Sequence, residues 1–227
     1  MISVLTMTYQ RHHILEEAIH SYLQNNLEDT EMVVLNDSPE VSYYFNHPNI
    51  RVINHPTRFA TLGQKLAFGF EQCRGEYIYR LDDDDLLTPF ALDLVKEQVK
   101  NDADIFRSNK AYLIMNGISH EAWSNVNNGS CYRAEWLKSI KVPDTTIVED
   151  KELTFESGGR IYTDSADKYT MIYRWNMDTY HISGAGVENA NNPNLVFNYV
   201  DMQVQKESGE ITLNPHFRGD YYKIINI

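Results

Sequence analysis

An α/β fold with a mostly parallel central sheet, covered by helices on both faces, is the class that this sequence predicts. Short apolar segments alternate with segments of helical periodicity over residues 1–100. Strands that are apolar throughout are typical of parallel sheets whose two faces are both buried. The chain has 227 residues and a hydrophobic content of 42%, which is enough for one sizeable core.

Strands and helices alternate regularly in the first half of the chain. Strands are predicted where short apolar-rich segments end in polar turns, at 2–7, 31–36, 51–54 and 76–81. Helices are predicted where apolar residues recur at helical spacing, at 13–25, around Leu62, Leu66, Phe70 and Cys73, and at 88–99. The last of these helices has Thr88 as its expected N-cap and Pro89 at its first position.

The second half is less regular. Its apolar segments predict strands at 103–108, 111–115 and 169–175, and a short helix within 148–159 that ends at two glycines. We expect one domain over residues 1–190. Residues 191–227 are expected to form a C-terminal extension with a hairpin, because segments of alternating polarity flank the turn-forming "KESG".

Composition limits the classes of partner and compartment. The formal net charge of −12 has the wrong sign for binding a polyanion over a broad surface. The two cysteines, Cys73 and Cys131, lack metal-site spacing and are interpreted as separate thiols. The sequence shows neither a signal peptide nor an apolar run of about 20 residues, the length that spans a membrane. We therefore expect a cytoplasmic protein.

Acidic residues directly follow two of the predicted strands. The acidic tetrad, Asp82–Asp85, comes after the strand at 76–81, and Asp37 comes after the strand at 31–36. Ligands of parallel α/β sheets bind at the carboxyl ends of the strands. Asp82 and Asp84 alternate, so both can turn to one side of a bend and offer oxygen ligands to Mg²⁺ or Mn²⁺. The alternative is a solvated acidic turn that the dipole of the following helix stabilises.

Four segments carry a resemblance to a known family: "ISVLTMTYQRHHILEEAIHSYL", "EMVVLNDSPE", "LGQKLAFGFEQCRGEYIYRLDDDDLLTP" and "VEDKEL". In this order and spacing they resemble the GT-A fold glycosyltransferases of family 2. The resemblance is good over residues 1–100 and thin beyond them. It implies that 1–100 form a nucleotide-sugar-binding half and that 101–190 form an acceptor half.

The resemblance implies a nucleotide pocket in the first half. Thr8, Tyr9 and Arg11 of "TYQR" are expected to contact the nucleotide sugar, and Asp37 is expected to hold the base through its imide. Lys65 is expected to cover a polar contact that the family makes through neighbouring Arg and Asn residues. Those two family residues are replaced here by Leu66 and Ala67.

The acidic tetrad matches a metal and ribose motif of the same family. Asp82 and Asp84 fall on its Asp-x-Asp pattern and are the implied metal ligands. Asp83 occupies the variable middle position and is expected to help bind the nucleotide sugar, while Asp85 matches a common following acid. His181 is a candidate third metal ligand or, alternatively, a structural histidine.

The implied catalytic residues lie in the second half. Asp150 of "VEDKEL" matches the base that deprotonates the acceptor hydroxyl, with Glu149 as the alternative base. The alternative role for Asp150 is to cap a helix. Gly129 and Ser130 match a small-residue loop near the donor sugar.

Two further patterns do not support a function. Arg174 and Trp175 resemble the Arg-Trp pair of processive members, but Met171 replaces the glutamine that should precede them, so processivity is not inferred. His12 and His13 have no acidic or cysteine partner at metal-ligand spacing.

The resemblance implies an inverting transfer of a sugar from a nucleoside-diphosphate sugar, expected to be a UDP-sugar, to a saccharide hydroxyl with Mn²⁺ or Mg²⁺. One alternative acceptor is a hydroxymethylated pyrimidine in phage DNA. That acceptor would need a local basic groove, for which the candidates are Arg51, Arg58, Lys65, Arg74 and Arg80. An alternative of another class is a nucleotide-sugar-binding protein that has lost turnover, as neutral residues at Asn36, Leu66 and Ala67 would allow.

Overall fold

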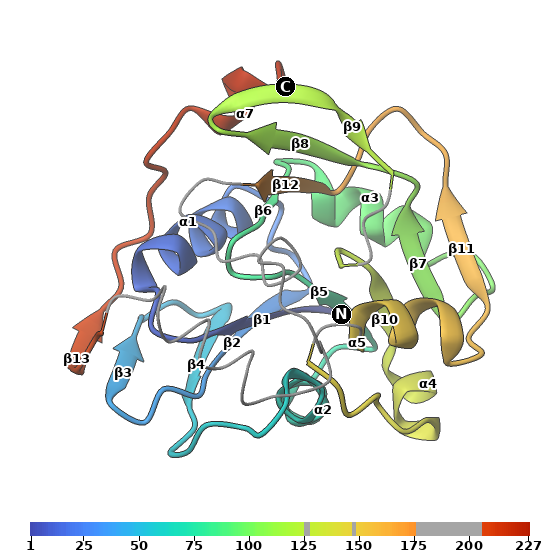
Figure 1. Cartoon of the computed structure of the whole chain (residues 1–227). Helices are drawn as coiled ribbons and strands as arrows, with labels where there is room; N and C mark the ends of the chain where they lie inside the picture. Colours follow the sequence, from blue (N-terminus) through green and yellow to red (C-terminus); the bar gives the residue numbers. More distant parts are fainter. Residues whose placement is uncertain (125–127, 147–148, 176–205) are drawn as a thin grey trace, which may run out of the picture.

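A seven-stranded sheet forms the centre of the computed structural model, which describes residues 1–124, 128–146, 149–175 and 206–227 (Figure 1). The strand order is β11-β7-β10-β5-β1-β2-β4. The bounds are Ile2–Thr8 for β1, Thr30–Asn36 for β2, Ile50–Asn54 for β4, Tyr77–Arg80 for β5, Ile105–Ser108 for β7, Cys131–Arg133 for β10 and Ile161–Asp164 for β11. All pairs are parallel except those of β10, which runs antiparallel to β5 and β7. The predicted mostly parallel sheet is confirmed.

Two smaller sheets accompany the central one. One has the order β6-β12-β8-β9, and the other pairs β13 with β3. Their bounds are Val41–Tyr44 for β3, Leu86–Leu87 for β6, Ala111–Met115 for β8, Ile118–Trp123 for β9, Met171–Trp175 for β12 and Gly209–Thr212 for β13. The sequence did not predict β3, β6 or β9. The strand β6 has only two residues, and β9 is largely exposed, so neither has the pattern of a buried strand.

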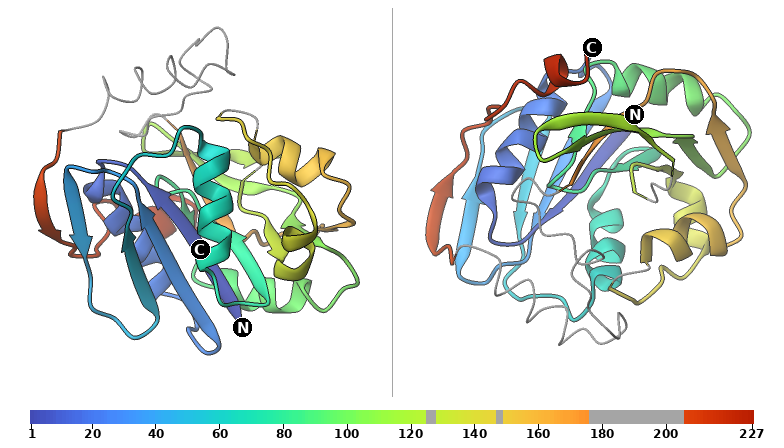
Figure 2. Two further views of the ribbon diagram at one scale, coloured as in Figure 1. Left: turned by 90° about the horizontal axis from the view of Figure 1, so that it is seen from below. Right: turned by 45° about the horizontal axis from the view of Figure 1, so that its top comes forward.

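Helices cover both faces of the central sheet, as predicted (Figure 2). Their bounds are His12–Leu23 for α1, Leu62–Gln72 for α2, Ala91–Gln98 for α3, Ala134–Ser139 for α4, Glu149–Lys151 for α5 and Tyr221–Ile224 for α7, with the π-helical turn η1 at Glu152–Glu156. Side chains alternate along a strand, so Val4 of β1 packs in the cluster that contains α1 and α3 residues. Leu5 packs in the cluster that contains α2 and α4 residues.

The start of α3 differs from the prediction. The helix begins at Ala91 after Phe90, which makes no side-chain cap hydrogen bond. The hydroxyl of Thr88, the predicted N-cap, instead donates to the carbonyl of Tyr169 at 3.0 Å. Thr88 is wrong as a cap because a partner 81 residues away in the sequence takes its hydroxyl.

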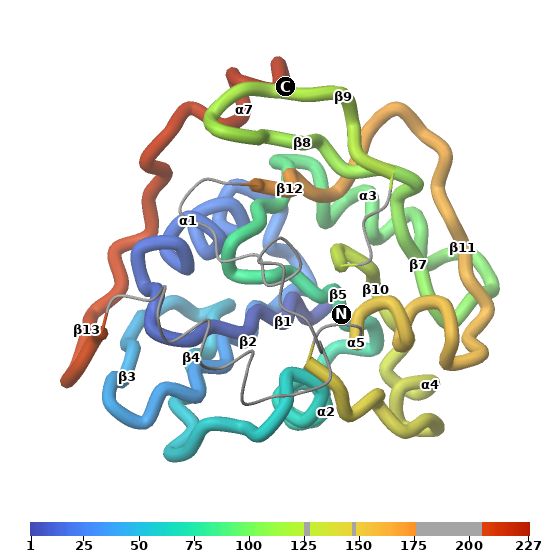
Figure 3. The backbone as a smooth tube through the Cα atoms, viewed as in Figure 1, coloured from blue at the N-terminus to red at the C-terminus, as the bar shows by residue number. Residues whose placement is uncertain are grey.

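The C-terminal residues 206–227 run from β13 past α1 to α7 (Figure 3). The strand β13 pairs in parallel with β3. The first arm of the predicted hairpin lies outside the described residues, so the hairpin stays a prediction. Cys73 and Cys131 are both free thiols, as expected. Within the described ranges, no helix has the length and apolar content that a membrane crossing requires.

Candidate active site

The acidic tetrad leaves β5 in a tight turn, in which the amide of Asp85 donates to the carbonyl of Asp82 at 3.1 Å. This turn brings three of the four carboxylates together and separates the fourth, that of Asp83, from them. One carboxylate oxygen from each of Asp82, Asp84 and Asp85 lies within 4.8 Å of the others. We call these three residues the acidic cluster. Asp83 points away from the cluster toward Arg11 and is fully buried.

Arginine and asparagine side chains offset the repulsion within the tetrad. Arg11, between β1 and α1, donates from Nε to Asp83 at 2.8 Å, and its Nη1 lies 3.5 Å from a carboxylate oxygen of Asp84. Burial would lower the pKa of Arg11, but the Asp83 and Asp84 carboxylates outweigh it and raise that pKa. Asn128 donates to Asp82 at 3.0 Å and to Asp85 at 2.7 Å. Hydrogen bonds and ion pairs therefore fix the side chains of the tetrad, and it is not a solvated turn.

The acidic cluster still has surplus negative charge. Burial and the neighbouring Asp84 and Asp82 raise the pKa of Asp85 well above its usual value. Three carboxylates at this separation suit a hard divalent cation such as Mg²⁺ or Mn²⁺, which prefers oxygen ligands. The side chain of Asp82 is 27% exposed, whereas Asp85 is fully buried, so a ligand would approach from the Asp82 side. The predicted third ligand, His181, lies outside the described residues, and Asp85 stands in the cluster instead.

The predicted nucleotide-pocket residues meet at the ends of β1 and β2. The ammonium of Lys65 donates to Asp37 at 2.5 Å and to the carbonyl of Thr8 at 2.7 Å, and all three residues are buried. The amide of Phe59 donates to the other oxygen of Asp37 at 3.1 Å. Beside them, the guanidinium of Arg58 lies 3.8 Å from the centre of the Tyr9 ring. Lys65 therefore fixes Asp37, which the sequence did not predict.

Asn36, the neutral residue before Asp37, has a structural role. Its side-chain amide donates to the carbonyl of Val41 at 2.8 Å and to Asn54 at 3.0 Å. Its oxygen accepts from the amide of Ser38 at 3.1 Å. These hydrogen bonds hold the turn from β2 into β3 and account for the neutral side chain at Asn36.

Two acids of the second half come close to the acidic cluster through Arg80. This arginine donates from Nε to Asp82 at 3.0 Å and from Nη2 to Glu149 at 2.9 Å. Burial raises the pKa of Glu149 to about 7, although Arg80 acts in the opposite direction. Burial likewise raises the pKa of Asp150, whose carboxylate accepts from the amide of Lys151 at 2.6 Å. Arg80 thus links the predicted metal site to Glu149, the alternative base, which is next to Asp150 in the sequence.

The loop of Gly129 and Ser130 lies against the same strand. Gly129 has φ +68°, and a Cβ there would lie 2.7 Å from the sulfur of Met171. Ser130 is buried, and its carbonyl accepts from the amide of Arg80 at 3.0 Å. The structure explains the small residue by packing, and the contact of this loop with the donor sugar stays a prediction.

Sequence reasoning missed the roles of three residues. Arg80 precedes Asp82 by two positions, a spacing that can place two side chains on one side of an extended chain, so this signal was available. Arg174 donates from Nε to the carbonyl of Asp84 at 2.6 Å, across a separation of 90 residues. Glu17 contacts Arg174 in turn at 2.6 Å. No local pattern indicates the last two roles.

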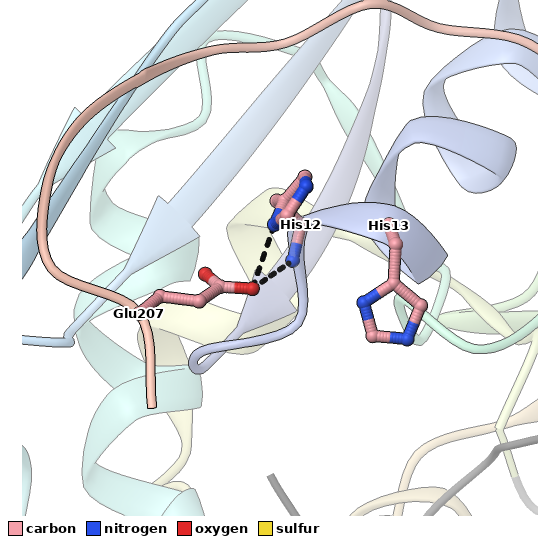
Figure 4. A group of neighbouring side chains, drawn as sticks. All are labelled: His12, His13 and Glu207. Carbon is pink, nitrogen blue, oxygen red and sulfur yellow. Dashed lines mark hydrogen bonds and ion pairs between the residues drawn. The ribbon is translucent and has the colours of Figure 1, made fainter. Parts of the chain in front are cut away.

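A second group of potential ligands lies at the start of α1 (Figure 4). His12, His13 and Glu207, which we call the helix-cap cluster, also have ligand atoms within 4.8 Å of one another. The sequence showed no acidic partner for these histidines because Glu207 is 195 residues away.

The bonds of Glu207 identify this cluster as a cap. One oxygen accepts from the backbone amide of His12 at 3.0 Å and lies 2.7 Å from its ring Nδ1. The other oxygen accepts from the hydroxyl of Tyr43. Arg11, the N-cap residue of α1, makes no side-chain cap hydrogen bond, so Glu207 supplies the acceptor that this helix end lacks. The positive end of the helix dipole and the adjacent Arg11 favour this carboxylate and disfavour a cation.

Comparison with known proteins agrees with this arrangement. The model of the family "Glycosyl transferase family 2" matches residues 3–138. The chondroitin synthase of Escherichia coli is 25% identical over 139 residues, which cover 55% of this chain and 20% of that protein. The hyaluronan synthase of Pasteurella multocida is 27% identical over 139 residues, which cover 55% of this chain and 14% of that protein. The chain thus matches a fifth or less of the length of these curated relatives.

A solved structure shows the same fold. It is residues 1–349 of S. aureus TarS in complex with UDP-GlcNAc, with a TM-score of 0.65 and 19% sequence identity. The match covers 89% of this chain and 65% of that one. The fold predicted from the sequence, GT-A, is confirmed. Because the family model matches more than half of the residues, this chain belongs to glycosyl transferase family 2.

Proposed function

We propose that this protein is an inverting, metal-dependent glycosyltransferase that moves a sugar from a UDP-sugar to a hydroxyl of a saccharide. One observation carries the proposal. Arg80 joins the acidic cluster, through Asp82, to the Glu149–Asp150 pair, so a cation-binding group and a basic group face one site. The proposed transfer uses both, one for the leaving diphosphate and one for the acceptor hydroxyl.

The donor side is formed by the acidic cluster and the pocket around Asp37. Asp82 and Asp84 would hold Mn²⁺ or Mg²⁺, with Asp85 beside them. When bound, this ion would neutralise charge on the leaving nucleoside diphosphate. Lys65 keeps Asp37 oriented at the end of β2, where the family resemblance expects the nucleobase of the donor to bind. Arg11 bonds to the buried Asp83 and so fixes the turn that carries the acidic tetrad.

The acceptor side is formed by Asp150 at the start of α5. Its carboxylate would take the proton of the acceptor hydroxyl as the oxygen of that hydroxyl attacks the anomeric carbon. The bond between the anomeric carbon and the phosphate oxygen breaks, and a single displacement inverts the configuration. Partial burial raises the pKa of Asp150 and so makes it a stronger base than an ordinary aspartate.

Two buried atoms support a polar ligand here. Among the described residues, neither Nη1 of Arg80 nor Oε2 of Glu149 has a hydrogen-bond partner. Buried polar groups are normally paired, so we expect a bound sugar to supply hydrogen-bond partners for these two atoms. Two of the three replacements that suggested a binder without turnover have structural explanations: Asn36 makes hydrogen bonds in a turn, and Leu66 is a fully buried core residue. Nothing in the structure explains Ala67.

The names of the relatives support a UDP-sugar and a saccharide acceptor. One similar structure is a complex with UDP-GlcNAc, and the curated relatives are synthases of chondroitin and hyaluronan. The alternative DNA acceptor needs free basic side chains. Instead, Arg51 pairs with Glu31, Lys65 with Asp37, and Arg80 with Asp82 and Glu149. Carboxylates thus offset the charge of three of the five candidate residues, which counts against a basic groove for DNA.

Transfer assays with UDP-sugars, Mn²⁺ and saccharide acceptors test the proposal. We expect Asp150→Asn to lower the transfer rate by about 10²- to 10⁴-fold, the usual contribution of a general base. Asp167→Asn is the matched control because Asp167 is exposed and lies outside the site. Near-normal transfer by Asp150→Asn, with loss of transfer in Glu149→Gln, would move the base to Glu149. If no UDP-sugar is transferred or hydrolysed in the presence of Mn²⁺, the protein is not this enzyme.

A further inference from the structure

We propose that Glu17 and Tyr221 are positioning residues for the acidic cluster and that they act through Arg174. This inference rests on the proposed function, because it concerns the same cation-binding site. It assigns a role in that site to the last residues of the chain. Arg174 and Tyr221 both lie beyond residues 3–138, the part that the family model matches.

Arg174 is the direct link to the tetrad. Its guanidinium donates from Nε to the carbonyl of Asp84 at 2.6 Å, and its backbone amide donates to the carboxylate of Asp85 at 3.0 Å. The residue is 1% exposed, so water does not replace these bonds. Arg174 therefore fixes the position of the Asp84 backbone and the orientation of the Asp85 side chain.

Glu17 fixes the guanidinium of Arg174 from the opposite side. One of its oxygens accepts from Nη1 of Arg174 at 2.6 Å. The other accepts from the hydroxyl of Tyr221 at 2.6 Å and from the backbone amide of Arg218 at 2.8 Å. Each oxygen of this buried carboxylate is thus bonded, and Glu17 has one orientation available to it.

The charge balance makes this arrangement consequential. A buried arginine without a partner would be drawn to the nearest carboxylates, which belong to the acidic cluster. Glu17 provides a separate counterion, so Arg174 supports the tetrad without neutralising the acids that a cation needs. Tyr221 in turn holds Glu17 and packs with Leu86, Ile114 and Ile172. We therefore expect α7 to influence cation binding at the acidic cluster, through the contacts from Tyr221 to Glu17 and from Glu17 to Arg174.

Two neighbouring tyrosines provide a matched test. Tyr221→Phe removes the hydroxyl, which donates to Glu17 at 2.6 Å and accepts from Nη1 of Arg174 at 3.4 Å, but keeps the ring near Arg174. Tyr222→Phe makes the same chemical change in the same helix and removes only a bond to the carbonyl of Leu87. Binding of Mn²⁺ in the presence of UDP is measured by electron paramagnetic resonance, and the melting temperature of each variant is recorded.

We expect the dissociation constant of Mn²⁺ to rise about fivefold in Tyr221→Phe, because a hydrogen bond to a charged group is lost. It should stay within about twofold of the unchanged protein in Tyr222→Phe, although that variant also loses a hydrogen bond. A merely structural role would lower the melting temperature of both variants and leave Mn²⁺ binding equal in the two. Equal binding would overturn the inference.

Glu17→Gln is the stronger variant, with an expected rise of about tenfold or more because Arg174 loses its counterion. If this variant does not fold, the tyrosine pair decides. If the unchanged protein binds no Mn²⁺ with UDP, the proposed function fails and the inference fails with it. If the unchanged protein binds and the two tyrosine variants bind alike, only the inference fails.

Discussion

The acidic cluster and the helix-cap cluster differ more in the charges and dipoles that surround them than in the number of potential ligand atoms. Both place three potential ligand atoms within 4.8 Å of one another. The acidic cluster lies at the carboxyl end of a parallel strand and has more carboxylates than cations to pair with them. The helix-cap cluster lies at a helix N-terminus beside Arg11, where its one carboxylate is already bonded. Backbone dipoles and counterions, and not ligand types alone, thus decide which cluster is a candidate cation site.

The largest expected effect comes from Asp84→Asn, which tests the acidic cluster directly. The side chain keeps its size but loses a charge, so Mn²⁺ binding should be lost and transfer should fall about 10²- to 10³-fold. The melting temperature should change little, because removing one of several like charges relieves repulsion. Mn²⁺ titration and transfer assays check this. Unchanged Mn²⁺ affinity in the variant would show that the acidic cluster is not the cation site, so the two clusters would not differ in this respect.

The next effect concerns pH, through Glu149. Burial, with Asp150 and Asp82 adding to it against Arg80, raises the pKa of Glu149 to about 7 from an ordinary value of 4.5. The folded protein therefore binds this proton more tightly than the unfolded chain, and stability falls as pH rises from about 4.5 to 7. The loss from this one group is about 3 kcal/mol at most.

Glu149→Gln tests this effect because glutamine does not titrate. The free energy of unfolding is measured in urea at several values between pH 5 and pH 8. Relative to the unchanged protein, the variant should gain stability as the pH rises, by up to about 3 kcal/mol. A constant difference across this range would show that the pKa of Glu149 is not raised in the folded protein.

A smaller effect is expected for Glu207→Gln, which tests the helix-cap cluster. The amide oxygen can still accept from His12, but the negative charge at the helix N-terminus is lost. We expect the free energy of unfolding to fall by about 1 kcal/mol. Mn²⁺ affinity should stay the same, which urea denaturation and Mn²⁺ titration establish together. A large loss of Mn²⁺ binding would mean that the helix-cap cluster contributes to cation binding at the acidic cluster.

The smallest effect is expected for His13→Gln. If the helix-cap cluster is a cap, this change should alter stability by less than about 0.5 kcal/mol. Thermal shift with Zn²⁺ should be the same for the variant and the unchanged protein. A stabilising shift with Zn²⁺ that is present in the unchanged protein and absent in the variant would show that the helix-cap cluster binds a metal.

Sequence patterns predicted most of the first half correctly because its strands are buried and its helices amphipathic. Ile2–Thr8 and Thr30–Asn36 are buried at every position, so each appears as an apolar segment. Strands without such a pattern were missed. In the second half, Ile118–Trp123 is largely exposed. In the first half, Leu86–Leu87 is too short for any periodicity.

The sequence by itself determined the fold class, the place of the acidic tetrad after a parallel strand, and the family. These follow from local patterns, since apolar periodicity and residue spacing are properties of neighbouring residues. Only the tertiary structure decided what surrounds the tetrad: Arg11 beside Asp83, Arg80 between Asp82 and Glu149, and Arg174 on Glu17. Counterions of a buried carboxylate are chosen by distance in space, and a separation of 157 residues between Arg174 and Glu17 leaves no trace in the sequence.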